Sequence, residues 1–297
     1  MKHKILLILV SCLLASCALN NQFLQPTKIP NTVTNLEITT SFDTIRSIVN
    51  PKTRQPLFLN KKGDTISLNY TVHSMIFKSS SGNNLNGWLL KPKNQISEIT
   101  ILHLHGNGGL LYSQYKSMEP LLKFGFQIFL FDYSGYGFSE GKATRENIIK
   151  DATSALSYII NSDNIQNNKI VVYGHSLGGN LAAIIAPDIE DSIDGLIIEG
   201  AFSNHKDVAA NVAGFVGRLI VREKNDALKT IKDYNKPLLV IHSTEDETIP
   251  YEMGKKIFHS ANKPKELFTI KKCHMCGPRY YGKEISNKIK KMINYTE

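Results

Sequence analysis

The sequence predicts an α/β fold in which helices cover both faces of a mostly parallel sheet. From about Val72 onward, short apolar runs alternate with longer segments whose apolar residues recur every three or four positions. The segments with the most reactive side chains each follow an apolar run, and ligands bind at the carboxyl ends of parallel strands. The chain has 297 residues, 42% of them hydrophobic, which suits one large domain or two small ones.

The apolar runs predict the strands in chain order. Val72–Lys78 and Leu85–Lys91 should pair as a hairpin, with Ser80–Asn84 as its turn. The buried strands that we expect after this hairpin are Glu98–Leu104, Gln127–Phe131, Lys169–Tyr173, Gly195–Ile198, Pro237–His242 and Glu266–Ile270.

Helical spacing predicts helices between these strands. Thr144–Ile160 is amphipathic, with apolar residues at three-and-four spacing. The other expected helices are Ser113–Phe124, Asn180–Ala186 and Arg279–Ile293. Helices that alternate with short buried strands imply parallel crossovers, which cover the sheet on both faces.

The residues before the first hairpin are harder to assign. Asn20–Asn35 is polar, contains two prolines and has no clear period, so we expect a tether. Further on, Leu57–Leu59 and Thr65–Tyr70 are candidates for short strands around a turn at Lys62–Asp64.

The N-terminus has the pattern of a signal peptide. Basic Met1–Lys4 precedes apolar Ile5–Ala15, which is too short to span a membrane. The tetrad Leu14-Ala15-Ser16-Cys17 then resembles a bacterial lipobox, which implies that Cys17 becomes the acylated N-terminus, for example with palmitate. An ordinary signal peptide or an uncleaved anchor is the alternative. Because Ala18 rather than aspartate follows, the resemblance implies an outer-membrane address in a Gram-negative cell.

We therefore divide the chain into a lipoprotein signal peptide over residues 1–17, a tether and N-terminal extension over 18–70, and one α/β domain over 71–297. The net charge of +9 indicates a solvated basic surface, or attraction to an anionic membrane surface or to anionic substrates. No basic stripe is interleaved with aromatic residues, which argues against nucleic acid as a partner.

The segment Val171–Gly179, read as VVYGHSLGG, carries a G-x-S-x-G motif with Ser176 at its centre. An apolar run precedes it and a helical pattern follows it, which is the context of a nucleophile elbow. A tight turn projects the serine Oγ clear of the sheet, and the glycines let strand and helix approach closely. A glycine-rich helix start is the plain alternative.

A serine nucleophile needs a general base and a carboxylate that orients the base. His274 is the candidate base and Asp246 the candidate acid, because both follow late apolar runs in the order serine, acid, histidine. Glu199 is the rival acid, although a structural role in contact with loop backbone fits it better. His103, His175, His242 and His259 are expected to be structural.

Acyl transfer also needs donors for the oxyanion. The backbone N–H of Leu177 is one candidate, because it follows the nucleophile. The loop His105–Gly109, read as HGNGG, follows an earlier strand and should supply the second donor from Asn107, with Gly106 as the fallback. A simple glycine turn is the alternative.

Taken together, HGNGG, DYSGYGFSEG, GHSLGG, HSTEDETIP and a late histidine resemble the α/β-hydrolase superfamily over Val72–Tyr295. The resemblance is greatest to the compact branch with HGNxG loops, which includes monoacylglycerol-lipase-like enzymes and small esterases. It implies an α/β-hydrolase fold with a small cap and a serine hydrolase mechanism. It also implies that Asp132 and the turn Gly135–Gly137 shape the floor of the site.

The sequence departs from this family at two places. Ser243 stands where the acid loop usually has glycine, and Cys273 stands where glycine usually precedes the histidine. Cys273 and Cys276 could form a disulfide around His274 or remain free thiols; a metal is less favoured because no second ligand pair is at hand.

The expected function is that of a membrane-tethered serine hydrolase that cleaves carboxylic esters or thioesters, with a small-molecule ester or lipid as substrate and no cofactor. An amidase, peptidase or acyltransferase could use the same triad, and a non-catalytic binding module could keep the same fold. The cap should be small, with Ala209–Val221 as a short helix beside the site. The expected location is the cell envelope.

Overall fold

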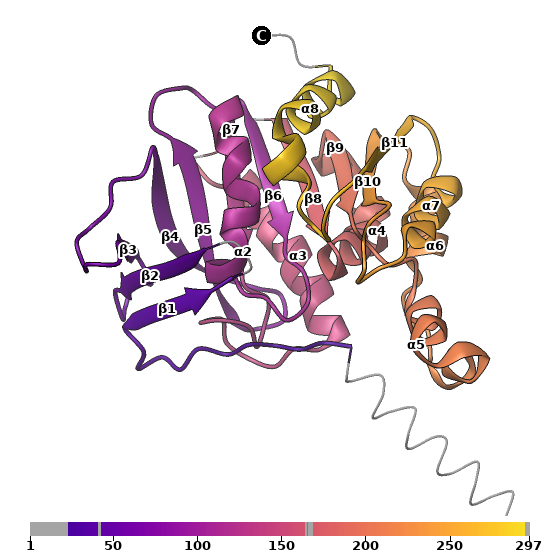
Figure 1. Cartoon of the computed structure of the whole chain (residues 1–297), viewed down its shortest axis with the longest axis horizontal. Helices are drawn as coiled ribbons and strands as arrows, with labels where there is room; N and C mark the ends of the chain where they lie inside the picture. Colours follow the sequence, from indigo (N-terminus) through magenta and orange to yellow (C-terminus); the bar gives the residue numbers. More distant parts are fainter. Residues whose placement is uncertain (1–22, 41–42, 164, 166–168, 295–297) are drawn as a thin grey trace, which may run out of the picture.

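The computed structural model describes residues 23–40, 43–163, 165 and 169–294. The predicted signal peptide and Cys17 lie outside these residues. An eight-stranded sheet forms the centre of the molecule, and helices lie on both of its faces (Figure 1).

The sheet has the order β11-β10-β9-β8-β6-β7-β5-β4. Strand β5 runs antiparallel to both of its neighbours, and every other pairing in this sheet is parallel, which confirms the prediction of a mostly parallel sheet. The register places Val172 at the centre, between Leu102 and Leu196. The strands are β4 (Tyr70–Lys78), β5 (Asn84–Pro92), β6 (Ile99–Leu104), β7 (Phe126–Phe131), β8 (Lys169–His175), β9 (Gly195–Glu199), β10 (Leu238–Ser243) and β11 (Lys265–Ile270).

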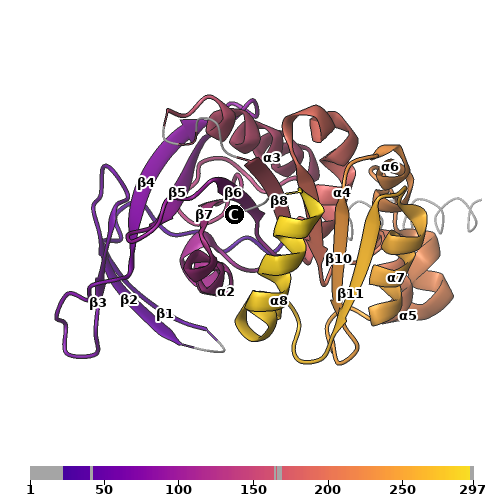
Figure 2. The ribbon, with the colours of Figure 1, turned by 90° about the horizontal axis from the view of Figure 1, so that it is seen from above.

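Both faces of the sheet are buried. Successive strand residues point to opposite faces, so that Ile101 packs in one apolar cluster and Leu102 in the other. Helices α2 and α8 lie over one face, and α3 and α4 lie over the other (Figure 2). The helices are α2 (Leu111–Met118), α3 (Arg145–Ile160), α4 (Leu177–Ile189), α5 (His205–Ile220), α6 (Ala227–Thr230), α7 (Tyr251–Ser260) and α8 (Gly277–Met292), with short 3₁₀ turns η1 (Glu119–Phe124), η2 (Glu190–Ser192) and η3 (Ile231–Asp233).

The sequence indicates why the helices begin and end where they do. Thr144 caps α3, because its side chain accepts the amide proton of Asn147. The predicted helix Ser113–Phe124 is wrong in one respect, since it divides into α2 and the 3₁₀ turn η1. Pro120 lies at the junction and has no amide proton to continue the α-helical ladder.

A three-stranded antiparallel sheet precedes the main sheet and consists of β1 (Asn35–Thr39), β2 (Thr44–Val49) and β3 (Pro56–Leu59). It packs on the core through buried Ile45, Val49 and Phe58. The candidate strand at Leu57–Leu59 is confirmed. The candidate strand at Thr65–Tyr70 is wrong: Thr65 makes only an isolated bridge, and residues 65–67 are exposed, so no buried face supports a ladder there.

Part of the segment expected to be a tether packs against the domain. From Phe23 onward the chain is described, and Leu24 and Ile29 are buried. The backbone of Gly137 exchanges hydrogen bonds with the chain at Thr27 and Ile29, both at 2.8 Å. The expectation of a tether is therefore wrong for this part, because its few apolar residues and its backbone find partners on the domain. In the described part of the chain, no helix is long and apolar enough to cross a membrane.

Candidate active site

Ser176 lies on a tight turn between β8 and α4. Its backbone angles are φ 50° and ψ −110°, a conformation that L-residues rarely adopt. A Cβ atom on Gly178 would lie 1.9 Å from the carbonyl oxygen of Leu104, and one on Gly174 would lie 2.3 Å from the carbonyl oxygen of Gly178. Only glycine allows this close packing of strand and helix. The predicted strand, turn and helix around Ser176 are therefore all present.

The backbone of the turn is fixed to the neighbouring strand. The amide of Ser176 donates to the carbonyl oxygen of Glu199 at 2.9 Å, and the carbonyl of Ser176 accepts from the amide of Asn180 at 3.0 Å. These contacts place Ser176 at the carboxyl ends of β8 and β9, where sequence reasoning expects ligands to bind.

Asp246 and His274 come together although 28 positions separate them. Asp246 lies in the loop after β10 and His274 in the loop after β11, and Asp246 Oδ2 is 2.6 Å from His274 Nδ1. The other oxygen of Asp246 accepts the amide protons of Thr248 and Ile249 at 2.9 and 2.8 Å. An imidazole held in this way carries its proton on Nδ1 and leaves Nε2 free to accept another.

The Asp246 side chain is almost fully buried, and burial by itself favours the neutral acid. The hydrogen bond and charge of His274, together with the amides of Ile249 and Thr248, favour the carboxylate more strongly. The net result is a pKa of Asp246 below its usual value. Asp246 is therefore an ionised acceptor opposite the ring of His274.

Ser176 and His274 both lie next to the backbone at the end of β9. The amide of Ser176 donates to the carbonyl oxygen of Glu199, and the ring of His274 lies beside Gly200. Gly200 has φ +58°, and a Cβ atom there would lie 3.1 Å from the ring of His274. Among the described residues, no hydrogen bond joins Ser176 Oγ to His274. Such bonds are often long in enzymes without substrate and shorten when substrate binds.

Glu199 is not the partner of His274. Its carboxylate accepts the Gly277 amide proton at 2.7 Å, the Tyr173 hydroxyl proton, and a hydrogen bond from His175 Nε2 at 3.0 Å. Burial favours the neutral acid, but the charge and hydrogen bond of His175 and the other donors hold the pKa of Glu199 below its usual value. This geometry fits the structural role that the sequence favours for Glu199, and not the role of the acid that orients His274.

A second buried histidine extends this network, since His103 Nε2 lies 3.0 Å from His175 Nδ1. Burial and the neighbouring His175 lower the pKa of His103 well below its usual value, so that its ring is neutral. Sequence reasoning identified His103 and His175 as structural but not their connection. The only sequence signal for this contact is that His103 and His175 each lie at or near the end of an apolar run, where neighbouring strands could bring them together.

The HGNGG loop lies at the carboxyl end of β6. Gly106, the fallback oxyanion donor, has its N–H engaged by Gln114 Oε1 at 2.8 Å. Leu177 is the first residue of α4, where the helix itself offers no carbonyl to the N–H. The N–H of Gly106 is therefore occupied, and Leu177 and Asn107 remain the candidate donors that the sequence predicts.

The Asn107 side chain anchors the N-terminal segment, which sequence reasoning missed. Its Oδ1 accepts the Gln25 amide proton at 2.8 Å and the Tyr136 hydroxyl proton at 3.1 Å, and its Nδ2 donates to the carbonyl oxygen of Phe23 at 2.9 Å. The segment that starts at Phe23 therefore lies directly against the proposed oxyanion loop.

Asp132 has the structural position that the resemblance implies. Its Oδ1 accepts the Leu111 amide proton at 2.6 Å. A Cβ atom on Gly137, where φ is +47°, would lie 1.9 Å from Asp132 Oδ2, so only glycine fits there. Burial raises the pKa of Asp132 to about 7, although hydrogen bonds from the surrounding backbone oppose this.

Cys273 and Cys276 are free thiols in this structure, the first exposed and the second buried. Cys276 Sγ donates to the carbonyl oxygen of Cys273 at 2.8 Å. Burial raises the pKa of the Cys276 thiol. In the part of the chain that the structure describes, no group of three or more His, Cys, Asp or Glu residues could hold a metal ion.

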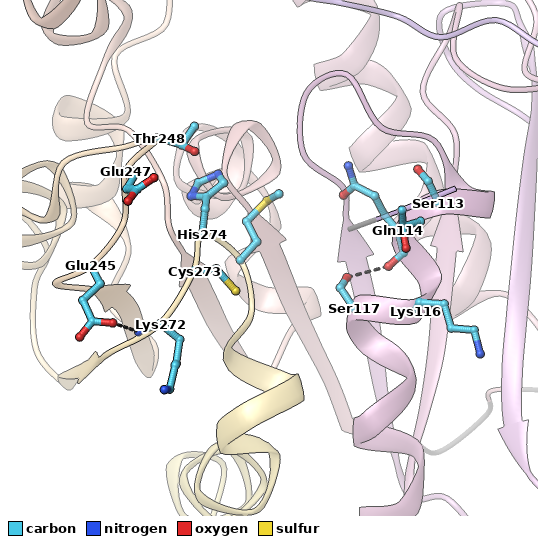
Figure 3. Close-up of a pocket in the computed structure, with 12 residues that line it drawn as sticks. Ser113, Gln114, Lys116, Ser117, Glu245, Glu247, Thr248, Lys272, Cys273 and His274 are labelled. Atoms are coloured by element: carbon cyan, nitrogen blue, oxygen red, sulfur yellow. Dashed lines mark hydrogen bonds between the residues drawn. The ribbon is translucent and has the colours of Figure 1, made fainter. Parts of the chain in front are cut away.

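An open cavity of about 680 Å³ lies beside His274. Figure 3 shows Ser113, Gln114 and Ser117 on α2 facing the loop of His274 across this cavity. Most of its lining residues carry a polar or charged group, with Glu245 among those on the histidine side, but apolar atoms make up the larger part of the lining surface. A polar part of a substrate therefore finds hydrogen-bond partners next to the candidate base.

Comparisons with known proteins agree with this architecture. A family model described as "alpha/beta hydrolase fold" matches residues 99–220. The uncharacterised protein YfhR of Escherichia coli K12 is 26% identical over 205 residues, which cover 68% of this chain and 72% of YfhR. Lysophosphatidylserine lipase ABHD12 of Danio rerio is 25% identical over 251 residues, which cover 72% of this chain and 65% of that lipase.

Two solved structures share the fold. The esterase Pf2001 of Pyrococcus furiosus superposes with a TM-score of 0.64 at 17% identity, over 76% of this chain and 91% of the esterase. Est1E of Butyrivibrio proteoclasticus, solved with ferulic acid, gives a TM-score of 0.60 at 21% identity, over 74% and 98% of the two chains. The chain therefore has the α/β-hydrolase fold, and the family model of that fold matches part of it, over residues 99–220.

Proposed function

We propose that the protein is a serine hydrolase that cleaves carboxylic esters or thioesters. The observation that carries this proposal is the hydrogen bond between Asp246 and His274 at the sheet edge that also presents the strained Ser176. Asp246 and His274 pair although they are remote in sequence, and Ser176 follows a strand of the same sheet, which supports the arrangement that a triad needs. The hydrolase family model and the esterases among the structural neighbours support the same class of activity.

In the proposed reaction, His274 Nε2 takes the proton of Ser176 Oγ as the oxygen attacks the ester carbonyl. Asp246 holds the proton on Nδ1 and stabilises the imidazolium that forms. The amides of Leu177 and Asn107 donate to the oxyanion. His274 then returns the proton to the leaving alcohol or thiol. Water, deprotonated by the same histidine, releases the acid from the acyl-enzyme.

We further propose that the substrate is an ester with a polar alcohol part, such as a lipid with a headgroup. The polar groups of the cavity beside His274, together with its apolar lining surface, support this, because the leaving group must lie next to the residue that protonates it. ABHD12 of Danio rerio is a lipase by name, which is consistent with such a substrate.

Membrane attachment through an acylated Cys17 is part of the proposal. It is supported by the lipobox-like tetrad after an apolar segment. Several acyl chains on one residue would hold the protein firmly at a bilayer, since each buried CH₂ contributes about 0.8 kcal/mol. The expected location is the cell envelope, with the outer membrane favoured in a Gram-negative cell.

The test is labelling of the full-length protein in membranes with a fluorescent fluorophosphonate. The parent should be labelled, and Ser176→Ala should not. Ser192→Ala, at an exposed serine in η2, is the matched control and should be labelled like the parent. Labelling that persists in Ser176→Ala, or an unlabelled parent, would refute the proposal. Esters and amides of rising acyl length would then define the substrate.

A further inference from the structure

Large exposed apolar side chains gather on α5. Val212, Phe215, Val216 and Leu219 are 81%, 72%, 62% and 67% exposed. Single exposed apolar residues are normal on any protein, but four within eight consecutive positions form a continuous patch. We call these four residues the α5 patch. Figure 1 shows α5 projecting from the body of the molecule, apart from the sheet.

The α5 patch belongs to an ordered bend. The helix is interrupted at Ala213 and Gly214, and Gly214 has φ 59°. A Cβ atom on Gly217 would lie 2.2 Å from the carbonyl oxygen of Ala209, so the second half of α5 packs back against the first. The bend leaves the apolar side chains at its tip without cover from the domain.

Asp207 fixes this bend to the domain. Its carboxylate accepts hydrogen bonds from Arg218 in the second half of α5 and from Lys256 on α7, the latter at 2.8 Å. Ser203 donates to the same carboxylate at 2.7 Å. The patch is therefore held in a fixed direction, as a docking surface requires.

The charge around the α5 patch favours an anionic surface. Arg218 and Arg222 lie on the stretch of residues 208–222, and the two carboxylates that border it are already engaged, Asp207 by Arg218 and Lys256 and Glu223 by His205 and the Lys206 amide. Apolar side chains flanked by arginine are typical of helices that lie in the interface of a membrane, because the cations meet the lipid headgroups.

The start of the described chain lies at the base of the same helix. The Phe23 ring contacts the ring of His205, the first residue of α5, with 4.9 Å between centroids. Phe23 follows Cys17 by six positions, and an extended chain spans at most about 3.6 Å per residue. At most about 22 Å of extended chain therefore separates the proposed lipid attachment at Cys17 from Phe23.

We propose that the α5 patch docks on the surface of the bilayer, with its apolar side chains in the acyl boundary and Arg222 among anionic headgroups. The inference rests on the proposed membrane attachment at Cys17, which brings the bilayer to this end of the molecule. The membrane then meets the molecule beside the loops that present Ser176, and an ester lipid reaches the site without crossing bulk water.

The first test places a tryptophan in the patch. Full-length Phe215→Trp is reconstituted in phosphatidylcholine–phosphatidylglycerol vesicles with or without brominated acyl chains. Bromine should quench the emission of the introduced tryptophan by at least half. Ile96→Trp is the control. Ile96 is 89% exposed and lies in the loop before β6, whereas the candidate active site lies at the other, carboxyl end of that strand. Trp88 is fully buried and gives both variants the same background.

Equal quenching in the two variants would overturn the proposal, provided that flotation shows the protein on the vesicles. A blue-shifted emission of Phe215→Trp without bromine quenching would also overturn it, because a second copy or residues 1–22 would then cover the patch. Failure to float would instead refute the attachment at Cys17. None of these readouts depends on catalysis, so the proposed hydrolase activity stands or falls separately.

The second test separates docking from chemistry. In Phe215→Ser/Leu219→Ser, hydrolysis of an ester lipid embedded in vesicles should fall at least fivefold, while hydrolysis of a soluble short-chain ester stays unchanged. Ile96→Ser should change neither rate. An equal loss on both substrates would assign the α5 patch a role in folding or in the site itself and would overturn docking.

Discussion

The carboxylate of Glu199 accepts the amide proton of Gly277 at 2.7 Å, which joins the end of β9 to the start of α8. Gly277 lies three positions after His274, and the other oxygen of Glu199 holds His175, the residue before Ser176. One buried carboxylate therefore fixes the histidine loop relative to the nucleophile turn. We infer that Glu199 is a positioning residue for the candidate triad.

Glu199→Gln should lower both stability and kcat. In wild type, both oxygens of Glu199 accept hydrogen bonds, from Gly277, His175 and Tyr173. The NH₂ group of glutamine cannot accept, so at least one of these donors would lose its partner, and a buried donor without a partner costs about 1–3 kcal/mol. A displaced His274 should lower kcat by roughly tenfold or more. Urea unfolding and ester kinetics measure the two effects. Glu266→Gln, at a surface ion pair with Lys288, is the control. Equal behaviour of the two variants would contradict the positioning role.

The contribution of Glu199 should depend on pH. Its pKa is below the ordinary value of 4.5, because His175 and the other donors outweigh the effect of burial. The native state therefore binds fewer protons than the unfolded state, so this stabilisation is complete above about pH 4.5 and is lost as pH falls through the lowered pKa. The difference in unfolding free energy between wild type and Glu199→Gln should shrink below pH 4.5. If the difference in unfolding free energy between wild type and Glu199→Gln is the same at about pH 7 and about pH 3, the lowered pKa of Glu199 does not stabilise the fold as predicted.

Asp246→Asn should remove most of the activity without unfolding the protein. An asparagine amide can donate to His274 Nδ1, which favours the tautomer that cannot accept the Ser176 proton. We expect kcat to fall by about 10³ to 10⁴ with little change in KM. Steady-state kinetics measure this. Glu247→Gln, an exposed carboxylate in the same loop, should retain activity. A loss of less than tenfold in Asp246→Asn would exclude Asp246 as the acid of the triad.

Gly178→Ala should destabilise the fold severely. The new methyl group would lie 1.9 Å from the Leu104 carbonyl oxygen, which belongs to a central strand and cannot retreat. The expected loss exceeds about 4 kcal/mol or prevents folding. Gly282→Ala in α8 is the control, because its methyl group would meet only the Phe124 ring, at 3.2 Å. Circular dichroism and urea unfolding distinguish the outcomes, and similar stability of both variants would contradict the tight elbow.

The parts that sequence reasoning predicted are those with local patterns. The strand Lys169–Tyr173 and the turn at Ser176 follow from an apolar run and a glycine-rich motif in adjacent positions. Strands β1 and β2 were not predicted, because their inward apolar residues pack in a cluster whose other members, such as Trp88, lie far along the chain. The contacts of Glu199 with Gly277 and of Asn107 with Phe23 join residues that are 78 and 84 positions apart, which no local pattern encodes.

The two thiols beside His274 should differ strongly in reactivity. Cys273 is exposed, whereas Cys276 is buried and the pKa of its thiol is raised, so its thiolate is scarce at neutral pH. With Ellman's reagent, the folded protein should show a fast phase that Cys273→Ser abolishes. A phase slower by roughly 100-fold should be abolished by Cys276→Ser. If instead neither thiol reacts until a reductant is added, the pair is a disulfide in the native protein, and the histidine loop is under redox control.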